Sequence, residues 1–308
     1  MLTSAFEWLD RRAAPLLAVA LLVGLALPDL AAALRPFLTP AVIGLLASAL
    51  LRIDWRQVRA YVRRPLLTAL MLAWLLVLTP IVVWLVMHAV PLPATLVTAL
   101  VLWSSSPVIT AVPAFALLFG LDAAFALIAM LATSLLQPVI QPPLVSALLG
   151  IELEIGTAVL MGRLALIVGA AVALAGLIGW SLGARRVRHA ASPIGGIAVT
   201  MLIVFAIGVM DGVTAALAHD PARVLLFIAA AFAVSLALQG AGALAFWGTG
   251  RRVGLAVALA SGNRNMAILI AALGEAAHPD FGLFFACVQF PIYLMPALLG
   301  PVYRRLLR

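Results

Sequence analysis

The sequence predicts an all-helical integral membrane protein. Of its 308 residues, 66% are hydrophobic and only 10% are charged, whereas soluble domains have about 25% charged residues. The basic charge comes from arginines that lie between apolar segments, which is not the pattern of a nucleic-acid-binding face. The composition therefore predicts the lipid bilayer, and no nucleic acid, as the partner of this chain.

The helices follow from the apolar segments, of which about ten are long enough, or nearly so, to cross about 30 Å of hydrocarbon. In chain order they cover residues 13–33, 37–51, 66–89, 94–120, 122–149, 155–181, 193–217, 222–247, 251–277 and 280–303. The first segment follows a charged stretch and lacks a small-residue cleavage site, so we expect a retained helix rather than a signal peptide.

The arginines predict how these segments are oriented. If the N-terminus is cytoplasmic, the inner connections and the C-terminus carry Arg52, Arg56, Arg59, Arg63, Arg64, Arg185, Arg186, Arg188, Arg251, Arg252, Arg304, Arg305 and Arg308. The outer side then holds Arg35 and Arg223 together with Glu152, Glu154, Asp211, Asp220, Glu275 and Asp280. Arginine-rich connections stay in the cytoplasm, so we expect a multi-pass protein of the bacterial inner membrane with both termini cytoplasmic.

The two halves of the chain carry signs of an internal repeat. Three pairs of matching residues are separated by 158 positions (280 − 122 for the first): Asp122 with Asp280, Pro138 with Pro296, and Pro143 with Pro301. Each copy has about five spans, and an odd number of crossings inverts the second copy. We therefore expect one membrane domain made of two inverted repeats, residues 1–150 and 151–308.

Polar residues interrupt two apolar segments at matching places. Residues 104–107 (Ser-Ser-Ser-Pro) and nearby Pro113 free backbone carbonyls in the fourth segment, although a proline kink patched by serine hydroxyls would also explain them. Residues 261–265 (Ser-Gly-Asn-Arg-Asn) place a permanent positive charge in the ninth. An arginine near the bilayer midplane costs about 3 kcal/mol on insertion scales, so Arg264 must face protein, water or a ligand. Paired broken helices are typical of a transporter binding site.

Substrate contacts are expected from both breaks and from the fifth segment. The candidate substrate-binding residues are Ser105, Ser106, Thr110, Gln137, Asn263, Arg264 and Asn265. Gln137 lies one turn from Gln141, and hydrogen bonding between helices would explain both glutamines equally well. Arg163 could face the same cavity, pair with Glu152 or Glu154, or reach the outer interface. Asp122 is expected to cap the start of the fifth segment.

The same stretches resemble the bile acid:sodium symporter family, with arsenite-efflux carriers as more distant relatives. Residues 105–113 (Ser-Ser-Pro-Val-Ile-Thr-Ala-Val-Pro) follow the Cys-Cys-Pro-Gly-Gly-Thr-Ala-Ser-Asn-like motif of the family's fourth helix. Residues 137–142 (Gln-Pro-Val-Ile-Gln-Pro) are similar to its Ser-Pro-Leu-Leu-Thr-Pro-like signature, and residues 258–263 (Ala-Leu-Ala-Ser-Gly-Asn) stand where the ninth helix has Glu-Val-Gly-Met-Gln-Asn. The resemblance implies that the fourth and ninth helices are broken and cross near the membrane centre.

The chain departs from the family at the sodium ligands that the resemblance implies. These ligands fall on Val112, Pro113, Ala126, Met130 and Ala258, whose side chains offer no oxygen. Arg264 instead adds a fixed cation with five donors, one residue after the matched Asn263. We therefore expect a secondary-active or facilitative transporter of a small organic anion, with no cofactor and no metal.

Two alternatives stay open. One is sodium-coupled organic anion symport through a rearranged ion site of backbone carbonyls, Thr110, Asn263 and Asn265. The other is a transport-silent membrane sensor or assembly subunit. An enzyme is not expected, because no zinc-binding His-Glu-x-x-His pair and no Gly-x-Ser-x-Gly nucleophile motif occurs. The sequence does not indicate an oligomeric state.

Overall fold

The computed structural model describes residues 6, 8–9, 12–53, 64–150, 155–274 and 278–307. Several charged residues used above for orientation and pairing lie outside these ranges: Arg56, Arg59, Arg63, Glu152, Glu154, Glu275 and Arg308. In the described residues the only extended pairing is one isolated bridge, so the all-helical prediction is confirmed for them. The chain forms two compact units, each built from two separate stretches.

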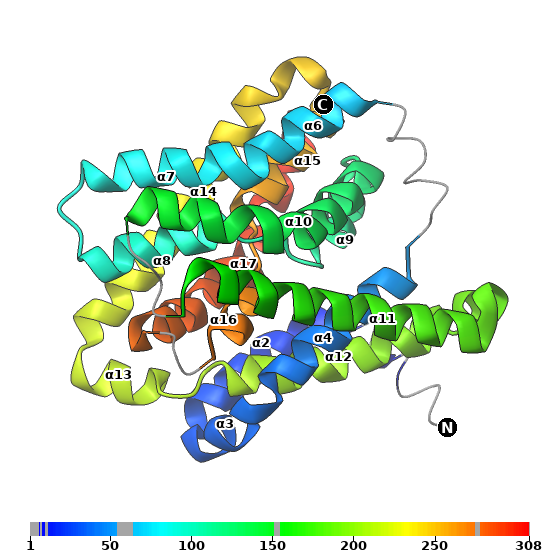
Figure 1. The fold of residues 1–308 in the computed structure, drawn as a ribbon, viewed down its shortest axis with the longest axis horizontal. Coiled ribbons are helices and arrows are strands. Elements are labelled where there is room, and N and C mark those ends of the chain that lie inside the picture. The colour runs from blue at the N-terminus through cyan, green and yellow to red at the C-terminus, as the bar shows by residue number, and fades with distance from the viewer. Residues whose placement is uncertain are drawn as a thin grey trace. The chain divides into compact units, whose positions relative to one another are not determined.

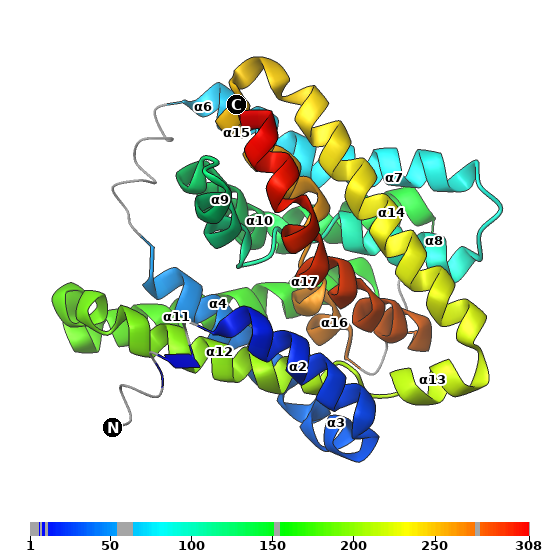
Figure 2. The ribbon, with the colours of Figure 1, turned by 180° about the vertical axis from the view of Figure 1, so that it is seen from behind.

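Unit 1 consists of residues Met1–Ile53 and Ala165–Val224. Its helices are α2 (Ala13–Ala26), α3 (Pro28–Leu34), the 3₁₀ turn η1 (Arg35–Phe37), α4 (Leu38–Leu51), most of α11 (Thr157–His189), α12 (Ala191–Gly208) and α13 (Val213–His219). Helix α12 packs against α2, α3 and α4 (Figure 2). Glycine permits a close approach of α2 to α12, because a Cβ on Gly24 would lie 2.7 Å from the Ile207 carbonyl oxygen.

Unit 2 consists of residues Asp54–Leu164 and Leu225–Arg308. Its first stretch holds α6 (Pro65–Ala73), the π-helical segment η2 (Trp74–Leu78), α7 (Thr79–His88), α8 (Ala94–Ser104), α9 (Val112–Phe119) and α10 (Ala123–Leu149). Its second stretch holds most of α14 (Pro221–Ala245), η3 (Trp247–Thr249), α15 (Arg251–Gly262), α16 (Ala267–Leu273) and α17 (Pro279–Leu307).

Two packings inside unit 2 position the site. Helix α10 lies beside the helix formed by α6, η2 and α7 (Figure 1). Helix α14 lies beside α17 (Figure 2), where the rings of Phe227 and Phe284 meet edge to face at 5.9 Å. Further along, the Tyr303 hydroxyl donates to Gln239 Oε1 over 2.8 Å.

Six helices of the described residues are long and apolar enough to cross a membrane, or seven if the two parts of α17, bent by 48°, count as one span. The six are Pro28–Leu51, Pro65–His88, Ala123–Leu149, Thr157–Gly183, Ala191–His219 and Pro221–Ala245. Helix α2 has only 14 residues, and each half of a broken helix is shorter still. The expectation of ten spans therefore stays a prediction.

The boundary between the first two segments was predicted wrongly. The sequence interpretation placed it near residues 34–36, but the first helix ends at Ala26 and the next runs from Pro28 to Leu51. Pro28 occupies the first turn of α3, where its missing N–H does no harm. Pro36 lies within the 3₁₀ turn η1, and the helical segment Pro28–Leu51 continues through it.

Candidate functional site

The two interrupted helices of unit 2 pair with each other at their breaks. Helix α8 ends before Pro107 and α15 before Asn263, and Val108 and Arg264 form an antiparallel bridge. The Ile109 N–H donates to the Asn263 carbonyl over 3.1 Å, and the Asn265 N–H donates to the Pro107 carbonyl over 2.6 Å. Each break thus satisfies backbone groups that the other has freed, as apolar surroundings require. We call this meeting point the crossing.

The serines of the first break and the glutamines of α10 form one buried network. Ser105 and Ser106 both donate to the Leu102 carbonyl, one turn back in α8. Gln141 Nε2 lies 3.0 Å from Ser105 Oγ and 3.2 Å from Ser106 Oγ. Gln141 Oε1 accepts a hydrogen bond from Gln137 Nε2 over 2.6 Å. The structure therefore brings together three candidate residues and adds Gln141 as the one that links them.

The guanidinium of Arg264 is fully buried at the crossing. Its Nε donates to the Ser261 carbonyl over 2.9 Å, and its Nη1 donates to the carbonyls of Leu75 at 2.8 Å and Ser106 at 3.3 Å. Its Nη2 donates to Thr79 Oγ1 over 2.9 Å. These bonds use four of the five guanidinium N–H groups. No carboxylate forms an ion pair with Arg264 in the described part of the chain.

The Leu75 carbonyl is available because the helix around it is irregular. In the π-helical segment Trp74–Leu78, the Thr79 N–H bonds the Trp74 carbonyl five residues back. Pro80 follows and has no N–H to give. The Leu75 carbonyl therefore accepts from side chains, namely the Thr79 hydroxyl at 2.9 Å and Arg264. The sequence interpretation missed this third element, although a Thr-Pro pair inside an apolar segment is a signal that could have indicated it.

Two hydroxyl-to-carbonyl contacts in unit 2 match each other across the expected repeat, although the single Thr79 O–H points mainly to the nearer Leu75 carbonyl. The Thr79 hydroxyl lies 3.4 Å from the carbonyl of Ser104, the last residue of α8. The Ser235 hydroxyl lies 2.7 Å from the carbonyl of Gly262, the last residue of α15. The two donors are 156 positions apart (235 − 79) and the two acceptors 158 (262 − 104). This correspondence supports the repeat, whose boundary at residue 150 stays a prediction.

Two candidate residues keep accessible polar groups at the crossing. Thr110 and Asn265 are half-buried, and the structure gives the Thr110 hydroxyl no hydrogen bond among the described residues. Asn265 Oδ1 accepts from the Ala267 N–H at 3.0 Å, which leaves its amide NH₂ group. Asn263 differs, because it is fully buried and donates to the Leu259 carbonyl over 2.8 Å.

Two buried side-chain oxygens near this network have no hydrogen-bond partner in the described part of the chain. They are Asn263 Oδ1 at the second break and Gln137 Oε1 on α10. Buried polar atoms are normally satisfied by protein, water or an ion. Both oxygens are acceptors, so they call for a donor or a cation.

The positions where the resemblance placed the family's sodium ligands hold buried apolar groups. Val112, Ala126, Met130 and Ala258 are all 2% exposed or less, and Pro113 is half-buried. No group of three or more His, Cys, Asp or Glu residues gathers in the described ranges.

Two further residues act at helix ends rather than at the crossing. Asp122 Oδ1 accepts from the Phe125 N–H over 2.9 Å, so its predicted capping role at α10 is confirmed. Arg163 Nη1 donates to the carbonyls of Ala272 at 3.1 Å and Leu273 at 3.3 Å, the last residues of α16. A cation at a helix C-terminus is favourable. Of the settings considered for Arg163 in the sequence, pairing with Glu152 or Glu154 lies outside the described residues.

Apolar spans with two interrupted helices that pair at their breaks define a multi-span membrane transporter. The model of the sodium bile acid symporter family matches residues 39–216, which is more than half of the chain. The chain belongs to this family, as the motifs predicted, and the family consists of transporters rather than enzymes. The matched range includes the first break and the Thr79 segment but ends before Arg264. A comparison with curated proteins found no match.

Proposed function

We propose that the chain transports a small organic anion without coupling to sodium, by facilitated diffusion or anion exchange. The observation that carries the proposal is the fully buried Arg264, which has no carboxylate partner among the described residues. An arginine side chain carries its positive charge at neutral pH. Carbonyl dipoles hold the guanidinium in place but leave a net charge of one in a low-dielectric region. A bound anion would neutralise that charge.

The accessible polar groups of the crossing are proposed as the direct contacts of the anion. Thr110 and Asn265 each offer a donor from opposite breaks, an O–H and an NH₂ group. The other candidates are buried, and we propose that they position these two accessible groups. They are Ser105, Ser106, Gln137, Asn263 and Arg264. Arg264 then acts on the anion mainly through its field and through its remaining N–H.

Sodium independence is expected because the Arg264 guanidinium already bonds the backbone carbonyls that a sodium ion would need. The oxygens of Leu75, Ser106 and Ser261 would suit a small cation, and the Arg264 guanidinium already binds all three. A second monovalent cation about 6 Å away would be repelled by about 3 kcal/mol at an effective dielectric of 20. We infer that the Arg264 guanidinium supplies the positive charge that a bound sodium ion would otherwise supply.

The second candidate function is sodium-coupled anion symport, which the family name suggests. One observation favours it, because Asn263 Oδ1 is a buried acceptor with no partner among the described residues. A sodium ion there would take that oxygen together with backbone carbonyls. The two candidates differ in whether sodium strengthens the binding of the anion.

A ligand screen on the purified protein tests the anion site. We expect small carboxylates to raise the unfolding temperature in choline buffers, whereas chloride alone and organic cations do not. The double variant Thr110→Val, Asn265→Leu should lose this shift. Ser181→Ala, which removes an exposed hydroxyl in unit 1, should keep it. Stabilisation by no anion, or by carboxylates only when sodium is present, would overturn the proposal.

A further inference from the structure

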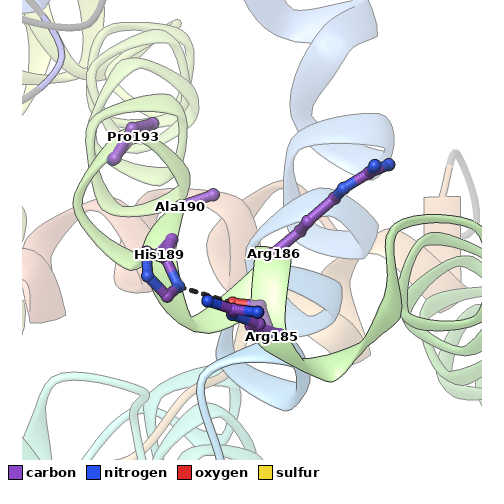
Figure 3. A pocket seen from close by; sticks show the side chains of 5 residues that line it. All are labelled: Arg185, Arg186, His189, Ala190 and Pro193. Atoms are coloured by element: carbon purple, nitrogen blue, oxygen red, sulfur yellow. Dashed lines mark hydrogen bonds between the residues drawn. The ribbon is translucent and has the colours of Figure 1, made fainter.

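An open basic pocket lies in unit 1, where α11 gives way to α12. Helix α11 leaves helical geometry at Gly183, with φ 75° and ψ 150°. The short helical stretch beyond it and the start of α12 border an open surface pocket of about 610 Å³. Its lining residues are Arg185, Arg186, His189, Ala190 and Pro193. Figure 3 shows Arg185 and His189 side by side at the turn, with Arg186 extended away from them.

The stretch of sequence around this pocket carries no acidic residue. The sequence contains no Asp or Glu between residues 155 and 210. Arg185 and Arg186 are exposed, and neither forms an ion pair in the part of the chain that the structure describes. His189 Nδ1 lies 2.8 Å from the Arg185 carbonyl oxygen, which orients the ring and leaves Nε2 available. The two arginines therefore offer several N–H donors and two positive charges to a ligand.

The pocket lies at the end of a membrane span. The apolar span Thr157–Gly183 stops two residues before Arg185. Trp180, one turn before that end, is 83% exposed. Exposed tryptophans mark the boundary between hydrocarbon and headgroups, and arginines beyond them reach the headgroup level. This end belongs to the arginine-rich side, which the sequence predicts to be cytoplasmic.

The start of α12 adds to the same charge. Its N-cap residue Ala190 makes no side-chain capping bond, and both Ala190 and Pro193 line the pocket. The first N–H groups of this 18-residue helix carry the positive end of its dipole. They reinforce the arginines without replacing them as the main source of charge.

We propose that this pocket binds the headgroup phosphate of an anionic phospholipid in the leaflet on the arginine-rich side. A phosphodiester supplies several acceptor oxygens for the N–H groups of the two arginines, and its acyl chains can remain in the bilayer beside Trp180. A soluble phosphate would meet the same donors but would gain nothing from the adjoining membrane boundary. The site lies in the opposite unit from the crossing and does not depend on the proposed transport function.

The test measures phosphatidylglycerol retention by the purified protein in native mass spectrometry, with phosphatidylcholine as the neutral comparison. The double variant Arg185→Gln, Arg186→Gln should weaken phosphatidylglycerol binding by about fivefold per arginine, or roughly 25-fold in all. The matched control is Arg304→Gln, Arg305→Gln, which removes two adjacent exposed arginines at the end of α17. It should leave binding unchanged.

A competition arm with wild-type protein separates the two sources of phosphate. Inorganic phosphate at equal concentration should not displace phosphatidylglycerol. Displacement by inorganic phosphate would show a site for soluble anions and overturn the lipid assignment. Equal loss of binding in both double variants would show a general charge effect and overturn the pocket itself.

Discussion

Arg264 shows how far a single residue can be interpreted from sequence. Its charge inside an apolar segment predicted a polar setting, and the structure gives it one made of protein oxygens. The identity of those oxygens could not be predicted. Two of the four belong to the irregular helix around Leu75 and Thr79, about 185 positions earlier in the chain. A contact of this kind depends on packing rather than on any local pattern.

Arg264→Ala should open a cavity that still presents carbonyl oxygens. We expect anion uptake to fall by about tenfold or more, because losing even one hydrogen bond from a charged group removes about 1.5–3 kcal/mol. Free ethylguanidinium should restore part of the uptake, and Arg264→Lys should be intermediate because an ammonium cannot reproduce the planar fork. The measurement is uptake by proteoliposomes with and without the added guanidinium. A well-folded alanine variant that transports normally would contradict the role of the charge.

Thr79 is the positioning residue for that charge. Its hydroxyl accepts from Arg264 Nη2 and donates to the Leu75 carbonyl, so both bonds are lost in Thr79→Val. We expect the valine variant to lose about 1–3 kcal/mol of stability and to transport poorly. Thr79→Ser keeps the hydroxyl and should behave like the wild type. Thermal unfolding and uptake, measured on both variants, check this, and equal behaviour of the two would show that the hydroxyl is not used.

At the level of helices, the sequence predicted interruptions better than it predicted ends. Both breaks lie where polar residues disrupt an apolar segment, together with proline in the first break and glycine in the second, since these residues change the hydrogen bonding of their own backbone. The end of the first helix was misplaced, because Pro28 and Pro36 look alike in sequence and only one of them begins a new helix. The π-helical segment Trp74–Leu78 went unnoticed, since one extra residue in a turn leaves no mark on hydropathy.

Pro80→Ala tests whether that irregular segment has a purpose. Alanine restores a backbone N–H and favours a regular helix, which would draw the Leu75 carbonyl back into its own helix. We expect lower uptake, because Arg264 would lose the Leu75 carbonyl as an acceptor, even though alanine is a better helix former than proline. Pro65→Ala, at the first turn of α6, is the matched control and should be neutral. Unchanged uptake in Pro80→Ala would mean that the irregularity does not support the crossing.

On the scale of the whole chain, the repeat and the compact units divide the sequence differently. Each unit draws one stretch from the first half of the chain, although that of unit 2 runs on to Leu164, and one from the second half, as interleaved repeats would produce. The Thr79 and Ser235 bonds to the ends of α8 and α15 support the same relation. Segment order alone could predict two copies, but not which helices pack together, because packing between distant stretches leaves no periodic signal.

The most direct measurement of the central claim is anion uptake into proteoliposomes with sodium replaced by choline, at fixed ionic strength and membrane potential. Arg264 occupies the freed carbonyls as a built-in cation, so we expect uptake to stay the same in both salts. A fall of about tenfold, the effect of about 1.4 kcal/mol of lost binding, would contradict it. Sodium would then bind at the crossing after all, with the unpartnered Asn263 Oδ1 as its first ligand.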